Sequence, residues 1–104
     1  GTAGGPKKCE WVVKELGFDA CIDYRTEKVA DRLAALAPGG IDVFFDNVGG
    51  AVMEAAFANL AMKARVALCG GIAGYTRLIP GPANYMQLVA KRARMEGFLV
   101  VDYV

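Results

Sequence analysis

Three apolar runs of this sequence end in glycines and hydrogen-bonding side chains. Glycine lets the backbone come close to a ligand, and cations, amides and phenols can bind or protonate one. In a parallel sheet, ligands bind beyond the carboxyl ends of the strands. The three stretches are therefore candidate binding sites. They are Gly4–Gly5 with Lys7–Lys8, Asp46–Gly50, and Cys69–Tyr75.

The first stretch, Gly4–Gly5, contains no acidic residue and is followed by Lys7 and Lys8. Dinucleotide-binding folds that select NAD often carry an acid at such a strand end, to hold the ribose diol. An acid-free turn followed by cations suits a 2′-phosphate instead, and hence NADP. The alternative is a solvated helix start with ordinary lysines. Residue type alone favours this alternative, because positive charge does not stabilise a helix N-terminus.

The second stretch ends the run "IDVFFD" with Asp46 and Asn47. Asn47 can both donate and accept hydrogen bonds, so it is a candidate ligand of a nicotinamide or a ribose. We interpret Asp46 as a residue that fixes the local backbone rather than as a general base. An ordinary turn is an equal alternative for the whole stretch, because Asp, Asn and Gly are common turn formers.

The third stretch offers Tyr75 and Cys69 as chemical groups. Tyr75 could donate a proton or a hydrogen bond to a substrate oxygen, and the alternative is a surface tyrosine on a flexible loop. Cys69 is better interpreted as a small packed residue than as a reactive thiol, because no neighbouring cation or base is evident.

Two further patterns, a Tyr-Lys pair at 24–28 and a basic run at 91–95, resemble functional motifs but have simpler interpretations. Residues 24–28, "YRTEK", have the Tyr-Lys spacing of short-chain dehydrogenases, but they precede the Asp46–Gly50 stretch instead of lying on a later helix. Tyr24 is then a side chain near the adenine end of a cofactor, or a half-buried strand cap. Residues 91–95, "KRARM", are interpreted as a helix C-terminus that complements the dipole, in preference to a phosphate or nucleic-acid site.

The composition excludes several classes of protein. The chain has 104 residues, of which 55% are hydrophobic and 22% charged, which predicts one domain or a part of one. The net charge of +1 gives no dedicated nucleic-acid or membrane surface. With no histidine, His-based metal sites and Ser-His-Asp triads are excluded from this chain, and we expect no metal site. Three cysteines without a C-x-x-C motif indicate a reducing, cytoplasmic setting.

Strand-like runs alternate with helical patterns along the chain, which predicts an α/β fold with a Rossmann-like, doubly wound parallel sheet. Thr26 and Asn84 are possible helix caps, Pro6 suits a first helical turn and Gly17 a helix end. The expected helices are 6–16, 26–37, 50–61 and 84–95, and the expected strands are 19–23, 41–46, 65–70 and 96–104, after the tail of an earlier strand at 1–5.

Several separate blocks, in order over essentially the whole chain, resemble the medium-chain dehydrogenase/reductase superfamily. The likeness is to its zinc-independent branch of NADP-dependent alkenal and prostaglandin or leukotriene reductases, with the bacterial curcumin-reductase-like enzymes. The blocks are "GTAGGPKKCEWVVKELGFDACIDY", "GIDVFFDNVGG", "ALCGGIAGY", "GP.NY" and "RARMEGFLVVDY".

The resemblance implies NADP(H) as the cofactor and assigns residues to it. Lys8 and Tyr24 fall on residues beside the 2′-phosphate, and Asn47 falls on an asparagine that contacts the nucleotide. Tyr75 falls on the tyrosine that orients the substrate or protonates the alkene, and is the candidate catalytic residue. The other implied cofactor-binding residues are Gly4, Cys69, Gly70, Ile72, Phe98, Leu99 and Val100, the last three on a strand whose backbone meets the carboxamide.

The resemblance also implies a function for the parent protein, which is reduction of the C=C bond of α,β-unsaturated aldehydes or ketones by hydride transfer. A quinone reductase or an alcohol dehydrogenase of the same superfamily is the alternative. The chain alone would be a non-catalytic nucleotide-binding or oligomerising module. We expect a cytoplasmic homodimer formed through the last strand, with a small-molecule substrate and neither nucleic acid nor membrane as a partner.

Residues 1–104 are predicted to be an incomplete dinucleotide-binding domain. The superfamily's first strand, its Gly-rich pyrophosphate turn and its catalytic substrate domain are not expected in this chain. In the strand order 3-2-1-4-5-6 the missing first strand is central. We therefore expect that the chain does not form a continuous six-stranded sheet.

Overall fold

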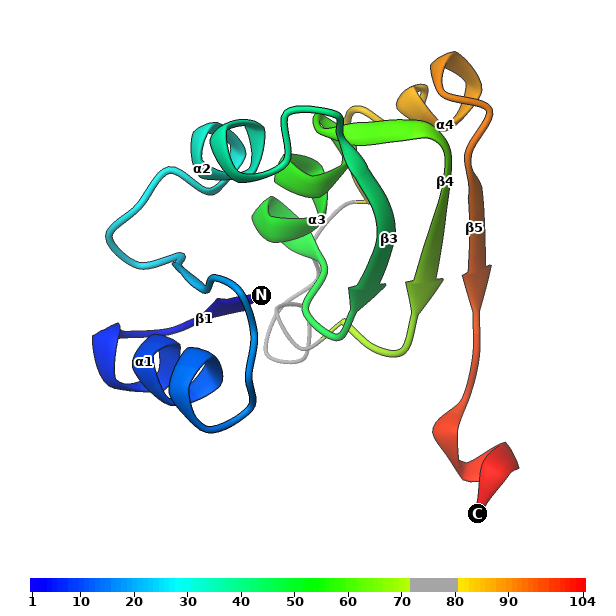
Figure 1. The fold of residues 1–104 in the computed structure, drawn as a ribbon. Helices are drawn as coiled ribbons and strands as arrows, with labels where there is room; N and C mark the ends of the chain where they lie inside the picture. Colours follow the sequence, from blue (N-terminus) through cyan, green and yellow to red (C-terminus); the bar gives the residue numbers. More distant parts are fainter. Residues whose placement is uncertain (72–80) are drawn as a thin grey trace. The chain divides into compact units, whose positions relative to one another are not determined.

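The structure is a computed structural model that describes residues 1–71 and 81–104. The chain divides into two compact units, Gly1–Pro38 and Gly39–Val104, called here the first and the second unit. In the first unit, two short parallel strands are joined through a helix that contacts both of them (Figure 1). Its elements are β1 (Thr2–Ala3), α1 (Pro6–Lys14), β2 (Ile22–Asp23) and α2 (Val29–Leu36).

The second unit contains a three-stranded parallel sheet in the order β3-β4-β5. The three arrowheads point the same way in Figure 1, so the carboxyl ends of the strands lie at one edge of the sheet. Its elements are β3 (Ile41–Asp46), α3 (Gly50–Phe57), β4 (Leu60–Leu68), α4 (Gln87–Ala90), β5 (Arg94–Gly97) and the 3₁₀ helix η2 (Val100–Tyr103).

The predicted α/β fold with parallel strands is confirmed. In the described part of the chain, the strands form a two-stranded and a three-stranded sheet rather than one continuous sheet, as expected. Within each sheet the neighbours follow the Rossmann order, with β2 and β1 as strands 3 and 2, and β3, β4 and β5 as strands 4, 5 and 6.

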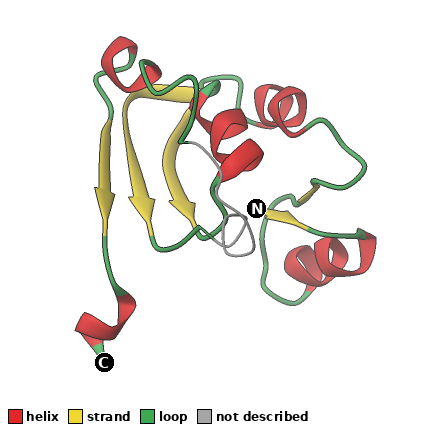
Figure 2. Ribbon diagram, turned by 180° about the vertical axis from the view of Figure 1, so that it is seen from behind, coloured by secondary structure: helices red, strands yellow, loops and turns green. Residues whose placement is uncertain are grey.

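The core of the second unit lies between α3 and one face of the three-stranded sheet, and Figure 2 shows this helix beside the strands. Phe57 of α3 is completely buried, and Met53 lies one turn before it. They pack against Leu60, Ala64 and Val66 of β4. Burial of these apolar side chains fixes the sheet and its helix together.

Helix α1 begins at Pro6, as the sequence predicts, and ends at Lys14, two residues before the predicted end at Leu16. Pro6 occupies the first turn, where its missing N–H costs nothing. At the other end, the N–H of Phe18 donates to the carbonyl of Val12 at 3.3 Å across Gly17, a bond that wraps a glycine-terminated helix.

The helix expected at 50–61 is wrong at its end, because α3 stops at Phe57 and β4 already begins at Leu60. Leu60 is buried and pairs with Ile41 of β3. The register then shifts, and Lys63 adopts a φ of 65°. Figure 1 shows that β4 bends along its length. Apolar residues at 60–62 fit a helix or a strand equally well, and packing under α3 selects the strand.

The two predicted helix caps are also wrong. Helix α2 begins at Val29 with Lys28 as its N-cap residue, so Thr26 lies outside the helix and does not cap it. Helix α4 covers only Gln87–Ala90 of the expected 84–95. The Nδ2 of Asn84 donates to the carbonyl of Glu54 at 2.9 Å, so it ties this segment to α3.

The last strand is shorter and earlier than the expected 96–104. It covers Arg94–Gly97, and the chain then continues past the sheet into the 3₁₀ helix Val100–Tyr103 (Figure 1). The interpretation of "KRARM" as a helix C-terminus is confirmed for its first two residues, because Lys91 is the C-cap of α4 and Arg92 donates to the carbonyl of Ala90 at 2.8 Å. It is wrong for Arg94 and Met95, which lie on β5.

No helix within residues 1–71 and 81–104 combines the length and the apolar character that crossing a membrane requires.

Candidate functional site

The turn after β3 is organised by the carboxylate of Asp46, which is only 2% exposed. Its Oδ1 accepts hydrogen bonds from the N–H groups of Val48 at 2.8 Å and Gly49 at 3.0 Å. Helix α3 starts directly afterwards, at Gly50. The prediction that Asp46 fixes the local backbone is confirmed. Asn47, which lies inside this turn, is exposed to solvent.

The ends of β3, β4 and β5 come together at one edge of the sheet in the second unit. The N–H groups of Cys69 and Gly70 donate to the carbonyl of Asp46 at 2.9 and 3.2 Å. The N–H of Phe98 donates to the carbonyl of Leu68 at 3.0 Å. This edge is therefore a continuous backbone surface made by three strand ends.

Four of the predicted site residues lie at this edge, which we call the strand-end site: Asn47, Cys69, Gly70 and Phe98. Phe98, Leu99 and Val100 all lie beyond the end of β5, so the placement of these three residues on a strand is wrong. Leu99 and Val100 are exposed. The ring of Phe98 packs against Phe45 and Tyr103, which draws the chain away from the extended course of a strand. Ile72 and Tyr75 lie outside the described residues.

The first unit brings together the other predicted residues, at the turn after β1. Gly4 is buried, and a Cβ built on it would lie 2.6 Å from the hydroxyl oxygen of Tyr24 and 3.1 Å from Nε of Arg25. A larger residue at position 4 would have to displace these two side chains. Lys8 lies in the first turn of α1 and is exposed, as are Tyr24 and Arg25. These three side chains present donors that suit an anion.

The sequence analysis missed Asp23, a buried carboxylate at the same turn. Its Oδ1 accepts the N–H groups of Gly5 and Arg25, both at 3.0 Å. These two hydrogen bonds hold the pKa of the Asp23 carboxyl below its ordinary value of 3.8, so the group is ionised at neutral pH. The turn Gly4–Gly5 contains no acidic residue, but the carboxylate of Asp23 from the next strand lies against it.

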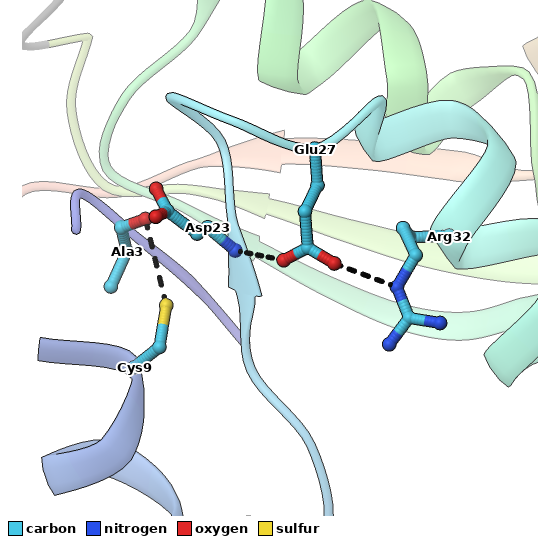
Figure 3. Close-up of polar contacts among 5 residues, drawn as sticks. All are labelled: Ala3, Cys9, Asp23, Glu27 and Arg32. Carbon is cyan, nitrogen blue, oxygen red and sulfur yellow. Dashed lines mark hydrogen bonds and ion pairs between the residues drawn. The ribbon is translucent and has the colours of Figure 1, made fainter. Parts of the chain in front are cut away.

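Figure 3 shows how the backbone at Asp23 is held from the other side. The N–H of Asp23 donates to Oε2 of Glu27 at 2.8 Å, and Oε1 of Glu27 pairs with Nε of Arg32 at 3.0 Å. A signal for Asp23 existed in the sequence, because the side chain of an Asp at the end of a strand commonly bonds the backbone N–H two residues further along the chain. The second partner, Gly5, is 18 residues away and carries no local signal.

The three cysteines are free thiols in the structure. Burial, and then the neighbouring thiol of Cys9, raise the pKa of Cys21 to about 11. Cys21 is therefore a neutral thiol at physiological pH. Cys69 is half-buried at the strand-end site, which fits the interpretation of a small packed residue.

We predict that Asp46→Ala destabilises the protein by about 2–4 kcal/mol, because two turn N–H groups lose a charged acceptor. Asp42→Ala is the matched control, since Asp42 is an exposed aspartate on the same strand. Urea unfolding of the full-length protein measures both. Asp46→Asn keeps an acceptor oxygen and should fall between them. Equal stability of the Asp46→Ala and Asp42→Ala variants would contradict this role.

Residues 1–103 match the family model described as zinc-binding dehydrogenase. A curated relative, the NADPH-dependent curcumin reductase of Escherichia coli (strain K12), is 41% identical over 110 residues, which cover 99% of this chain and 32% of the relative. The 2-alkenal reductase (NADP(+)-dependent) of Nicotiana tabacum is also 41% identical, over 107 residues that cover 99% of this chain and 31% of the relative.

A solved structure, CurA of Vibrio vulnificus in complex with NADPH, has a similar fold. Its TM-score is 0.85 at 42% sequence identity, covering 98% of this chain and 32% of that protein. The chain therefore spans about a third of the length of the relatives that it matches.

Proposed function

This chain belongs to the zinc-binding dehydrogenase family, and we propose that it is the cofactor-binding part of an NADP(H)-dependent oxidoreductase. The substrates proposed for the parent protein are α,β-unsaturated aldehydes and ketones, whose C=C bond is reduced. The names of two relatives, a curcumin reductase and a 2-alkenal reductase, support this substrate class. The catalytic substrate domain belongs, in this proposal, to the rest of the parent protein.

The observation that carries the cofactor assignment is the turn after β1. A buried glycine, Gly4, lies against a phenol and a guanidinium, with Lys8 one helical turn further along the chain. A 2′-phosphate needs donors and positive charge of this kind, whereas a free ribose diol needs acceptors. Lys8 and Tyr24 are the residues that we assign to the 2′-phosphate.

In the second unit, the strand-end site offers backbone and amide groups suited to a ribose and a carboxamide. We assign Asn47 and the backbone at Cys69, Gly70 and Phe98 to this part of the cofactor. The buried Asp46 carboxylate supports the assignment, because it holds the turn that carries Asn47. Ile72, Leu99 and Val100 remain proposed contacts on the strength of the resemblance.

When bound, NADPH supplies the hydride that reduces the alkene. The protein's task is to orient cofactor and substrate and to supply or relay a proton. Tyr75, outside the described residues, is the residue that we assign to orienting the substrate or protonating it.

The family description implies zinc, but the residues of this chain do not fit a zinc site. The sequence has no histidine. Among the residues that the structure describes, no three or more Cys, Asp or Glu side chains gather where they could hold a metal ion. We therefore derive no step through zinc within this chain. That the parent protein's reduction is zinc-independent is proposed on the strength of the resemblance to the zinc-independent branch of reductases.

We also propose that the parent protein is a cytoplasmic homodimer. β5 lies at an edge of its sheet and its residues are exposed, so its outer side can pair with a second copy. Analytical ultracentrifugation of the full-length protein at micromolar concentration should give the mass of a dimer. A monomer at every concentration would remove this part of the proposal.

The proposed function is tested by assaying the full-length protein with a 2-alkenal, a quinone and an alcohol, each with NADP(H) and NAD(H). We expect reduction of the 2-alkenal with NADPH to give the highest kcat/KM. A higher value for the quinone or the alcohol would favour a quinone reductase or an alcohol dehydrogenase instead. A kcat/KM at least tenfold higher with NADH than with NADPH would contradict the cofactor assignment.

A further inference from the structure

Asp23 joins two turns that are distant in the sequence but adjacent in the first unit. Its Oδ1 accepts the N–H of Gly5, in the turn after β1, and the N–H of Arg25, in the turn after β2, both at 3.0 Å. The residue is 7% exposed. One buried oxygen therefore fixes the position of each turn relative to the other.

The turn after β2 is also held from behind. Glu27 accepts the N–H of Asp23 and pairs with Arg32 on α2, so the stretch that carries Tyr24 and Arg25 is anchored at both ends (Figure 3). As a result, the hydroxyl oxygen of Tyr24 and Nε of Arg25 both lie beside Gly4, at 2.6 and 3.1 Å from the position that a Cβ on this residue would take. Both side chains remain exposed, and a ligand can reach them.

The charge of Asp23 creates an electrostatic requirement. An ionised carboxylate beneath the turn repels a phosphate that approaches the same turn, and partial burial strengthens the repulsion. A cation on the ligand side must offset it. Arg25 is the cation closest along the chain, and its planar guanidinium presents several donors that match phosphate oxygens.

We propose that Arg25 is a specificity-determining residue that binds the 2′-phosphate of NADP(H) beside Lys8 and Tyr24, and that Asp23 is the positioning residue that holds it there. This inference rests on the proposed function, because it assumes that the parent protein uses NADP(H). It adds a second cation to the site and gives a role to the buried carboxylate.

The direct test measures binding of 2′,5′-ADP and 5′-AMP to the full-length protein by isothermal titration calorimetry. These two probes differ only in the 2′-phosphate. Arg25→Gln should weaken 2′,5′-ADP binding by about tenfold or more and leave 5′-AMP binding within about twofold. Arg65→Gln is the control, since it removes an equal charge from an exposed arginine on the central strand β4 and should change neither.

A second pair of variants tests the positioning role. Asp23→Asn keeps an acceptor oxygen for Gly5 and Arg25, whereas Asp23→Ala removes it. We expect Asp23→Ala to weaken 2′,5′-ADP binding, and Asp23→Asn to restore wild-type binding or exceed it, because the repelling charge is gone. If Asp23→Asn is as weak as Asp23→Ala, the positioning role is wrong.

The outcomes separate this inference from the proposed function. If the wild-type protein does not distinguish 2′,5′-ADP from 5′-AMP, the NADP(H) assignment itself fails. If the wild-type protein prefers 2′,5′-ADP and Arg25→Gln keeps that preference, only the role of Arg25 fails. Arg25→Lys keeps the charge without the planar fork and should bind 2′,5′-ADP with intermediate affinity. A uniform loss for both probes in Arg25→Gln and Arg25→Lys would overturn the inference.

Discussion

Gly40→Ala is expected to destabilise the full-length protein by about 2–5 kcal/mol, the largest stability effect that we predict. Gly40 has a φ of +90°, which an L side chain rarely adopts. A Cβ there would lie 2.7 Å from both the α-carbon and the nitrogen of Ala61 on β4. Both atoms belong to the backbone, so neither can swing aside.

The neighbouring glycine supplies a matched control. A Cβ on Gly39 meets nothing within 4 Å, and Gly39 does not have a positive φ. Gly39→Ala should therefore be neutral or slightly stabilising, by at most about 1 kcal/mol. Urea unfolding and thermal melts of both variants measure the difference. Similar stability of the two would show that the loop before β3 can move away from β4.

The close contact at Gly40 explains which parts of the fold the sequence could predict. Pro38, Gly39 and Gly40 mark a break between a helix and a strand, and these residue types alone predict that break. Glycine is required at position 40 because the backbone of Ala61, 21 positions later, lies too close for a side chain. No local sequence pattern predicts this contact. For the same reason the helix expected at 50–61 was wrong, because the pairing of Leu60 with Ile41 overrides a helical pattern.

The end of the chain was mispredicted for a related reason. The run "FLVVDY" suits a strand by residue type, but a strand also needs a neighbour to pair with. Pairing of β5 with β4 ends at Gly97, opposite Leu68. Phe98 then packs its ring against Phe45, and the following residues form the 3₁₀ helix η2.

The candidate site was predictable where the chemistry is local. Asp46 was assigned to the backbone because it stands beside Asn47 at a strand end. The structure confirms this, since its carboxylate accepts the N–H groups two and three residues further on. Asp23 was missed because half of its role lies in a turn on another strand. The sequence around one turn shows the residues of that turn. It does not show a side chain from a neighbouring strand, such as Asp23, that bonds the backbone of the same turn.

Lys8→Ala is expected to give the largest functional effect, a loss of about 10–100-fold in affinity for NADPH with affinity for NADH unchanged. Hydrogen bonds to charged groups are worth about 1.5–3 kcal/mol, and each 1.4 kcal/mol is a factor of ten in binding. NADH has no 2′-phosphate, so it loses nothing. Fluorescence titration of the full-length protein with both cofactors measures the two affinities, and added salt should reduce the difference.

Two lysines of the same helix make the Lys8 experiment specific. Lys14 is exposed and pairs with Glu10 at 2.6 Å, a surface contact worth at most about 1 kcal/mol, so Lys14→Ala should leave both affinities unchanged. Lys7→Ala removes an equal charge from the same helical turn. A smaller loss of NADPH affinity than in Lys8→Ala would show that the position of Lys8 matters, and not only the positive charge of this turn. Lys8 itself faces the unfavourable end of the helix dipole, so its removal should not lower the stability. A stability loss in Lys8→Ala, or an equal loss of NADPH affinity in Lys14→Ala, would indicate that Lys8 has no specific role in NADPH binding.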